Sequence, residues 1–218
     1  MRRMNAGQVE RAIWIDFEGT TTGAPSMLGV LWMPSGESSP RLTQYVFDEG
    51  LRLAVEGTAA QFAHEIVMAD RMTTLRDLIA QSDETHRHLA SWSLHDYNEI
   101  VEKLGPIAVR FRNAKVTAKR WRAGRTQLSP DLPVVEFPHQ ELQRYLEFIG
   151  YHVPLEVQGD AATNIRNVRE RSAGKSSWED VSDGGKEAWR RLIEHNIHDL
   201  LGMQRVCRIA TGFETDFA

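Results

Sequence analysis

Apolar residues in the N-terminal part of the chain form short blocks separated by turn-forming residues. The block 11–17 (RAIWIDF) is rich in branched and aromatic side chains and runs into Gly19, which predicts a strand over about 10–18. Two further strands are predicted over 26–33 (SMLGVLWM) and 41–48 (RLTQYVFD), each reached through a short polar connection. Three successive strands joined in this way indicate an antiparallel meander.

The period of the pattern then changes. Over 57–82 the apolar residues are spaced by three and four, which predicts a helical segment. The block 86–93 (HRHLASWS) predicts another strand, and 95–105 (HDYNEIVEKLG) a short helix that ends at Gly105. The stretch 106–125 is apolar and basic and predicts a further helix.

The C-terminal part is helix-rich. Three prolines in 129–138 (SPDLPVVEFP) predict a loop, and 139–150 (HQELQRYLEFIG) predicts a helix that ends in glycine. A polar connector is predicted over 173–185 and a long final helix over 186–210. Strands followed by a strand within a helix-rich half favour a mixed α/β or α+β fold.

Composition narrows the class of protein. The 218 residues, 41% hydrophobic and 26% charged, are typical of a globular domain with a large core. A single cysteine, Cys207, excludes a disulfide framework and a thiolate zinc cluster, and we expect it to be a buried apolar residue. The net charge of −4 gives no overall attraction to nucleic acid, so such binding needs a local basic patch. The absence of a secretory h-region and of a membrane-spanning apolar stretch predicts a cytoplasmic protein without membrane contact.

Two carboxylates mark the end of the first predicted strand. Asp16 and Glu18 are two positions apart, so their side chains project from the same face. Like charges this close repel unless a cation or a proton lies between them. The alternative is a solvated pair on an edge strand, which the apolar block before Asp16 disfavours.

Two later segments, 91–96 and 193–203, contain further acidic residues that could join this pair. The segment 91–96 (SWSLHD) ends in Asp96, and 193–203 (IEHNIHDLLGM) places His195 and Asp199 four apart, on one face of a helix. Together with D-x-E these segments resemble the three motifs of the DEDD superfamily of 3′–5′ exonucleases. The last one also resembles the Y-N-x-x-D-x-x-x-L signature of predicted bacterial RNase H-like nucleases, with histidine in place of tyrosine. Ser91 and His95 depart from the usual asparagine and aromatic residue of the second motif.

The resemblance implies an RNase H-like fold, in which an antiparallel three-stranded meander is continued by parallel strands and flanked by helices. It implies one exonuclease domain over 1–218, with 106–180 as a candidate helical insertion or substrate-binding subregion. It further implies a site for two Mg²⁺ or Mn²⁺ ions that cleaves single-stranded DNA or RNA. The implied metal ligands are Asp16, Glu18, Asp96 and Asp199, and His195 would orient or deprotonate the attacking water.

Other interpretations of these residues remain open. Asp96 has the residue type of a helix N-cap, and His195 that of a hydrogen-bonded helix histidine. The segment 15–22 (IDFEGTTT) also resembles the D-x-D-G-T motif of haloacid-dehalogenase-like phosphatases, which have a parallel sheet, but Glu18 replaces the second aspartate. In 158–164 (QGDAATN) an asparagine replaces the last acid of that family's late motif. A third alternative is an inactive RNase H-like module that binds nucleic acid or protein.

A basic stretch without acids occupies 109–125 (VRFRNAKVTAKRWRAGR). Its cations could neutralise a phosphate backbone, and Trp121 and Phe111 could stack on unpaired bases. The alternative is a solvated helix face paired with acids elsewhere. The candidate cations are Arg110, Arg112, Lys115, Lys119, Arg120, Arg122 and Arg125. A looser basic group lies over 165–175, and we expect Trp178 and Trp189 to pack in the core.

Overall fold

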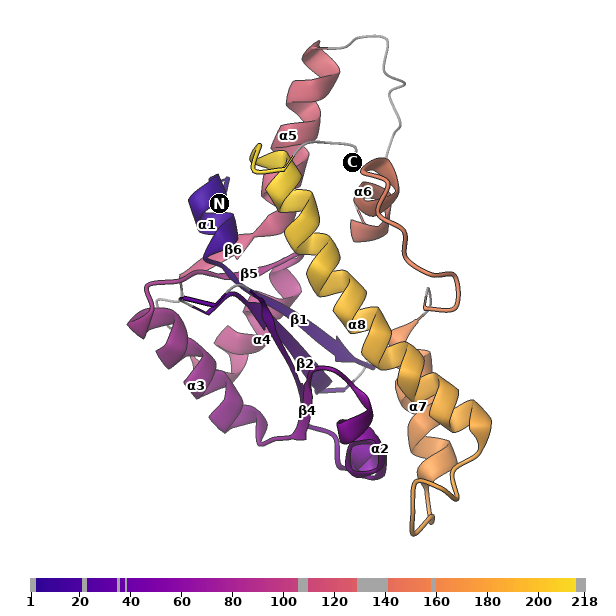
Figure 1. The fold of residues 1–218 in the computed structure, drawn as a ribbon. Coiled ribbons are helices and arrows are strands. Elements are labelled where there is room, and N and C mark those ends of the chain that lie inside the picture. The colour runs from indigo at the N-terminus through magenta and orange to yellow at the C-terminus, as the bar shows by residue number, and fades with distance from the viewer. Residues whose placement is uncertain are drawn as a thin grey trace.

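A six-stranded mixed sheet forms the centre of the protein, in the strand order β4-β3-β2-β1-β5-β6 (Figure 1). The computed structural model describes residues 3–20, 23–34, 36–37, 39–105, 110–128, 141–157 and 160–214. Within these residues, no helix is both long and apolar enough to cross a lipid bilayer.

The predicted meander is confirmed. Its strands are β1 (Ile13–Gly19), β2 (Pro25–Trp32) and β3 (Arg41–Val46), paired antiparallel in that order. The strand predicted over 86–93 is β5 (Leu89–Ser91), which runs parallel to β1. The mixed α/β class, with parallel strands continuing the meander, is therefore correct.

Two short strands lie where helices were predicted. β4 (Glu65–Met68) interrupts the predicted helix 57–82 and pairs parallel to β3, flanked by α2 (Arg52–Thr58) and α3 (Arg71–Glu84). β6 (Phe111–Asn113) occupies part of the predicted helix 106–125 and pairs parallel to β5, before α5 (Ala114–Leu128). In both cases hydrogen bonding to an open sheet edge outweighs local helix propensity. Residues 106–109 lie outside the described part of the chain.

The remaining helices follow their predictions in part. α4 (Leu94–Leu104) ends as predicted at Gly105, whose φ is 82°, and α6 (Leu142–Phe148) is followed by Gly150 with φ 68°. The chain opens with α1 (Ala6–Glu10), a short helix that the sequence did not predict, before β1. The predicted loop 129–138 and the first residues of the predicted helix 139–150 lie outside the described residues.

Two helices carry the C-terminal part of the fold. α7 (Ala161–Ser172) was not predicted, because its apolar stripe of Ala161, Ile165 and Val168 is narrow in a polar sequence. α8 (Asp183–Ala210) begins three residues earlier than predicted and ends at the predicted residue. The described residues of the candidate helical insertion 106–180 include β6. This stretch therefore contributes a strand to the sheet as well as helices.

The helices cover both faces of the sheet. α3 and α4 cover one face, whereas α8 runs diagonally across the other, with α7 beside its first half and α5 near its end (Figure 1). The core under α3 and α4 contains Ile13, Ile15, Phe17, Leu28, Val30, Leu75, Leu78, Leu89, Ile100 and Phe111. As expected, Trp178, Trp189 and Cys207 are buried in the cores on the α8 face.

The α8 face holds two apolar clusters rather than one. Trp14 and Leu31 belong to the first cluster, and Met27 and Val46 to the second. Between the two clusters, three residues lie opposite one another on adjacent strands. They are Asp16 on β1, Gly29 on β2 and Gln44 on β3. The middle of the α8 face is therefore polar.

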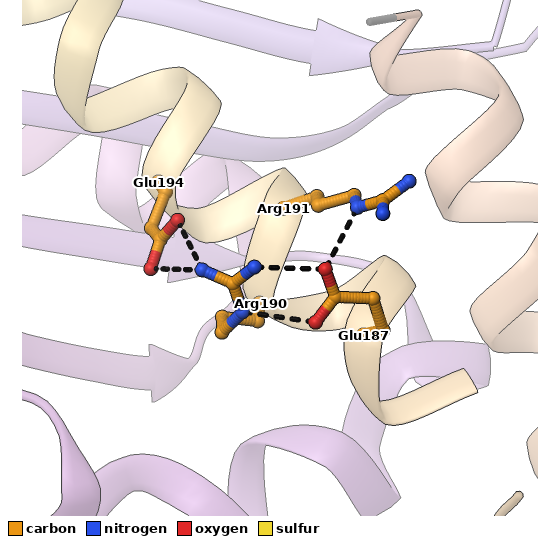
Figure 2. Close-up of polar contacts among 4 residues, drawn as sticks. All are labelled: Glu187, Arg190, Arg191 and Glu194. Carbon is orange, nitrogen blue, oxygen red and sulfur yellow. Dashed lines mark hydrogen bonds and ion pairs between the residues drawn. The ribbon is translucent and has the colours of Figure 1, made fainter. Parts of the chain in front are cut away.

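The solvent side of α8 is held by ion pairs within the helix. Arg190 lies between Glu187 and Glu194, three and four residues away, with N···O distances of 2.7–3.0 Å, and Arg191 Nε donates to Glu187 at 2.9 Å (Figure 2). Hydrogen bonds from Arg190 and then Arg191 lower the pKa of Glu187 to about 2, against the opposing effect of burial. These pairs stabilise the turn that precedes His195.

We expect the substitution Glu187→Gln to have a small effect. The side chain of Glu187 is 39% exposed, so solvent screening reduces the loss in free energy of unfolding to less than about 1 kcal/mol at neutral pH. Because the pKa of Glu187 is lowered on folding, its contribution is present above the ordinary pKa of 4.5 and lost as pH falls through about 2. Urea unfolding at low and high salt measures it. A loss that persists at high salt would contradict this prediction.

Candidate functional site

The C-terminal end of β1 lies open on one side. β2 pairs with β1 along its whole length, whereas β5 pairs only with Ile13 and Trp14. Beyond that point the first turn of α4 approaches β1, and the backbone N–H of Phe17 donates to Asp96 Oδ1 at 3.2 Å. The second motif is thereby brought to the strand that carries Asp16 and Glu18.

Asp96 is not the N-cap of α4. That position is Ser93, whose hydroxyl accepts from His95 N at 3.1 Å, and Asp96 is the third residue of the helix. Ser93 Oγ also donates to Asp96 Oδ2 at 3.0 Å, so both oxygens of this buried carboxylate have a donor from the protein. The capping interpretation of Asp96 is therefore wrong, and its charge faces the end of β1.

Glu18, His195 and Asp199 converge on one point. His195 Nε2 lies 3.8 Å from Glu18 Oε1 and 3.7 Å from Asp199 Oδ2. One ligand atom from each of the three residues lies within 4.8 Å of the other two. The i,i+4 spacing puts both α8 residues on the face that meets β1, as the sequence predicted.

Asp16 belongs to the same electrostatic group. Burial and the charges of Glu18, Asp199 and Asp96, in that order, raise the pKa of Asp16 well above its ordinary value. The four predicted acids thus act on one another, although they come from β1, α4 and α8. Four clustered carboxylates require compensating positive charge to be ionised together.

The cost of ionising a buried carboxylate in this group is clearest at Glu18. Burial raises the pKa of Glu18 to about 7, even though the nearby His195 favours its ionised form. Its Oε1 is buried and lacks a hydrogen-bond partner. A buried, unpartnered carboxylate oxygen is costly in a folded protein, and coordination of a cation would remove that cost.

His195 supplies part of the compensating charge. Burial disfavours its imidazolium, but the charges of Asp199 and Glu18 outweigh burial, so the pKa of His195 is raised. Burial also raises the pKa of Asp199, which His195 partly offsets. His198 Nδ1 lies 3.1 Å from the hydroxyl of Tyr151, and the charge of His198 also favours the ionised form of Asp199.

A cavity of about 580 Å³ opens beside this group. Its lining includes Glu18 and His195, together with His95 and Glu99 of α4 and Ala161 at the start of α7. A cavity of this size admits a nucleotide-sized ligand.

The donor set fits a hard divalent cation. Mg²⁺ and Mn²⁺ prefer carboxylate oxygen, and Mn²⁺ also accepts imidazole nitrogen, so Glu18, Asp199, Asp16 and Asp96 suit either ion. Oε1 of Glu18 has no hydrogen bond and lies 3.8 Å from His195 Nε2, so it is free to coordinate such an ion. Since His195 Nε2 faces the same point, it is a candidate ligand as an alternative to the water-activating role that the resemblance implies, because one lone pair cannot both bind an ion and accept a proton.

None of the predicted nucleic-acid-binding residues whose side chains the structure describes lines this cavity. Arg110 and Arg112 flank Phe111 at β6, and the others lie on α5, whose described side chains line no part of the cavity. Phe111 is buried against Tyr97, with ring centroids 4.9 Å apart, so it cannot stack on bases in this conformation. The ring of Trp121 packs edge-on against Phe148 at 5.7 Å. The α5 residues are Lys115, Lys119, Arg120, Trp121, Arg122 and Arg125.

Two polar residues of the site were not predicted. Asn196 is fully buried and its Nδ2 donates to Asp16 Oδ2 at 2.9 Å, and Gln44, also fully buried, donates to Asn196 Oδ1 at 3.0 Å. The available signal for Asn196 was the asparagine of the Y-N-x-x-D-x-x-x-L signature, which falls at this position. Gln44 gives no signal in the sequence beyond a polar residue on an otherwise alternating strand.

The sequence matches no protein-family model, and a search of curated proteins also finds no match. The geometry of the site is therefore the basis for assigning a function. That geometry consists of four carboxylates and one imidazole beside an open cavity.

Proposed function

We propose that the protein is a metal-dependent 3′–5′ exonuclease that hydrolyses phosphodiester bonds of single-stranded DNA or RNA. One observation carries this function: the convergence of Glu18, His195 and Asp199 at one partly buried point, with Asp16 and Asp96 close by. A solvated acidic surface would not leave Glu18 Oε1 buried without a partner. The acids also occupy the motif positions that resemble the DEDD exonucleases.

Asp16, Glu18, Asp96 and Asp199 would hold the Mg²⁺ or Mn²⁺ ions. When bound, such ions supply Lewis-acid stabilisation of the phosphate and lower the pKa of a coordinated water. The buried carboxylates are held close together by backbone and side-chain contacts, so little reorganisation would be needed on binding.

His195 is the residue placed to accept the proton that the attacking water loses. In hydrolysis, a water oxygen bonds to phosphorus, the bond from phosphorus to the 3′-oxygen breaks, and the water must lose a proton. His195 Nε2 lies at the edge of the cavity and within 4 Å of two carboxylates, so it can take up that proton as a neutral imidazole or hold the water as a donor. The 3′-oxygen that leaves receives a proton from solvent.

The arrangement of the strands favours this proposal over the phosphatase. β1 lies inside the sheet, pairs antiparallel with β2 and parallel with β5, which is the arrangement expected of an RNase H-like fold. A haloacid-dehalogenase-like phosphatase would need a parallel neighbour on both sides of that strand. The complete acid set also disfavours the inactive binding module, which would be expected to lack at least one of the four acids.

The decisive assay measures Mn²⁺-dependent shortening of 5′-labelled single strands of DNA and RNA. We expect wild-type protein to yield a ladder of shorter labelled products, and chelation with EDTA to stop the reaction. We expect Asp96→Asn to slow it at least about tenfold, because asparagine can keep the contacts to Phe17 N and Ser93 Oγ while losing the charge.

Asp77→Asn is the matched control, since Asp77 is exposed on α3 and does not line the cavity. Full-length strands after incubation of the wild type with Mn²⁺ or Mg²⁺ would refute the exonuclease. Hydrolysis of a chromogenic phosphate monoester instead would favour the phosphatase.

A further inference from the structure

A polar row crosses the sheet beneath α8. Asp16 pairs with Gly29, and Gly29 pairs with Gln44, so the glycine separates two polar side chains that face α8. The side chain of Asn196 extends from α8 toward Gly29 and lies between Asp16 and Gln44. Its Nδ2 donates to Asp16 O at 3.2 Å and to Asp16 Oδ2 at 2.9 Å, and its Oδ1 accepts from Gln44 Nε2 at 3.0 Å.

The direction of each hydrogen bond in this row is determined. The carbonyl of Ile193 can only accept, so the Gln44 atom that faces it at 3.0 Å must be the donor Nε2. The same Nε2 faces Asn196, which must therefore present Oδ1 to Gln44 and Nδ2 to Asp16. Gln44 Oε1 in turn accepts from His64 Nε2 at 2.8 Å.

Gly29 provides the space for this arrangement. A Cβ atom at that position would lie 2.0 Å from Asn196 Oδ1 and 2.7 Å from Leu200 Cδ1, which is closer than side chains can approach. The amide of Asn196 therefore packs directly on the backbone of β2. Its position is limited by the sheet below, by Gln44 on one side and by Asp16 on the other.

We propose that Asn196 is a positioning residue for the metal site, and that Gln44, supported by His64, fixes the direction of its amide. The inference rests on the proposed metal-dependent function and gives roles to Asn196 and Gln44, neither of which is among the predicted metal ligands. Asp16 lies among three other carboxylates, whose repulsion favours a rotamer that turns away from them. The donated hydrogen bond holds Oδ2 of Asp16, and with it the orientation of the carboxylate, against that repulsion.

The test uses Mn²⁺ alone, without nucleic acid. Isothermal titration calorimetry would compare Mn²⁺ binding to wild type, Asn196→Ala and Gln44→Met, with Asn98→Ala on the exposed side of α4 as the matched control. We expect Asn196→Ala to weaken Mn²⁺ binding about 10- to 100-fold, and Gln44→Met by a smaller factor of at least about threefold. We expect Asn98→Ala to bind as the wild type does.

Urea unfolding in EDTA separates this role from a purely structural one. If the loss of Mn²⁺ affinity exceeds what the change in unfolding free energy accounts for, and kcat falls while KM for the strand is unchanged, the positioning role is supported. A folded Asn196→Ala with Mn²⁺ affinity within twofold of the wild type would overturn it. If Asn196→Ala does not fold, Gln44→Met decides, because it keeps the contact between Asn196 and Asp16 while removing the group that directs it.

The two proposals fail in distinguishable ways. Wild type that binds Mn²⁺ and degrades strands, together with unaffected variants, overturns the positioning role alone. Wild type that binds Mn²⁺, with weakened variants and no degradation of any strand, supports the positioning role and overturns the exonuclease. Wild type that binds no Mn²⁺ overturns both.

Discussion

Replacing Glu18 with glutamine is expected to stabilise the metal-free protein at pH 8 and to abolish its Mn²⁺-dependent activity. Burial raises the pKa of Glu18 from 4.5 to about 7, so ionising it costs more in the folded protein than in the unfolded chain. Glutamine has nearly the same shape and carries no charge, so this cost disappears. The same substitution removes the carboxylate oxygen that lacks a hydrogen-bond partner and that suits a cation best.

The pH dependence follows from the direction of the shift. Below about pH 4.5 Glu18 is protonated in both states and its ionisation costs nothing. Between about 4.5 and 7 the folded protein retains the proton that the unfolded chain releases, so the free energy of unfolding falls as pH rises. Above pH 7 the full penalty is present and amounts to about 3 kcal/mol in metal-free protein.

Urea unfolding of wild type and Glu18→Gln in EDTA at pH 5 and pH 8 measures this difference. We expect the two proteins to be close in stability at pH 5 and the variant to be more stable at pH 8. Glu84→Gln, at the exposed end of α3, is the control and should leave the wild-type profile unchanged. With Mn²⁺ present, only the wild type should gain thermal stability. A variant less stable than the wild type at pH 8, or one that still cleaves, would contradict the prediction.

Much of the sheet could be predicted because its central strands carry strong local signals. The apolar blocks of β1 and β2 are too short and too rich in branched residues for helices. β4 and β6 lack such signals because they are four and three residues long, and an adjacent sheet edge rather than their own sequence makes them strands. The helix α7 was missed because its buried stripe consists largely of alanine and polar residues.

The acids of the site could be predicted, but not their full surroundings. Spacing alone places Asp16 with Glu18 on a strand and His195 with Asp199 on a helix. Bringing these pairs and Asp96 together required the resemblance to a nuclease family, since no local rule relates residues so far apart in the chain. That α8 lies over the end of β1 follows from the burial of its apolar face.

The supporting residues could not be predicted, because their roles depend on strand register. A shift of one residue between β2 and β3 would move Gln44 to the opposite face and leave Asn196 Oδ1 unpaired in the core. The buried polar row thus fixes the register of the sheet at the same time as it holds Asp16. An unpaired amide at that depth costs on the order of 1–3 kcal/mol, which penalises incorrect pairings.

Gly29→Ala is expected to damage both the fold and the site, although the substitution adds only one methyl group and Gly29 does not line the cavity. The new Cβ would overlap Asn196 Oδ1 and Leu200 Cδ1, and neither atom can move freely because α8 is buried over the sheet. We expect the free energy of unfolding to fall by about 1–3 kcal/mol. We also expect Mn²⁺ affinity to fall about as far as in Asn196→Ala, because displacing Asn196 releases Asp16. Urea unfolding and calorimetry measure the two effects.

A double-mutant cycle shows whether the clash acts through Asn196. Removing the Asn196 side chain makes room for the methyl group, so Gly29→Ala should cost less stability in the Asn196→Ala background than in the wild type, by 0.5 kcal/mol or more. The control is Gly124→Ala in α5, where a Cβ meets nothing within 4 Å and alanine should stabilise the helix by about 0.5–1 kcal/mol. Strictly additive effects of the two substitutions would show that Gly29 is needed for a reason other than its contact with Asn196. If the effects on stability are not additive, and both single variants lose Mn²⁺ affinity equally, then Gly29, Asn196 and Asp16 are energetically coupled.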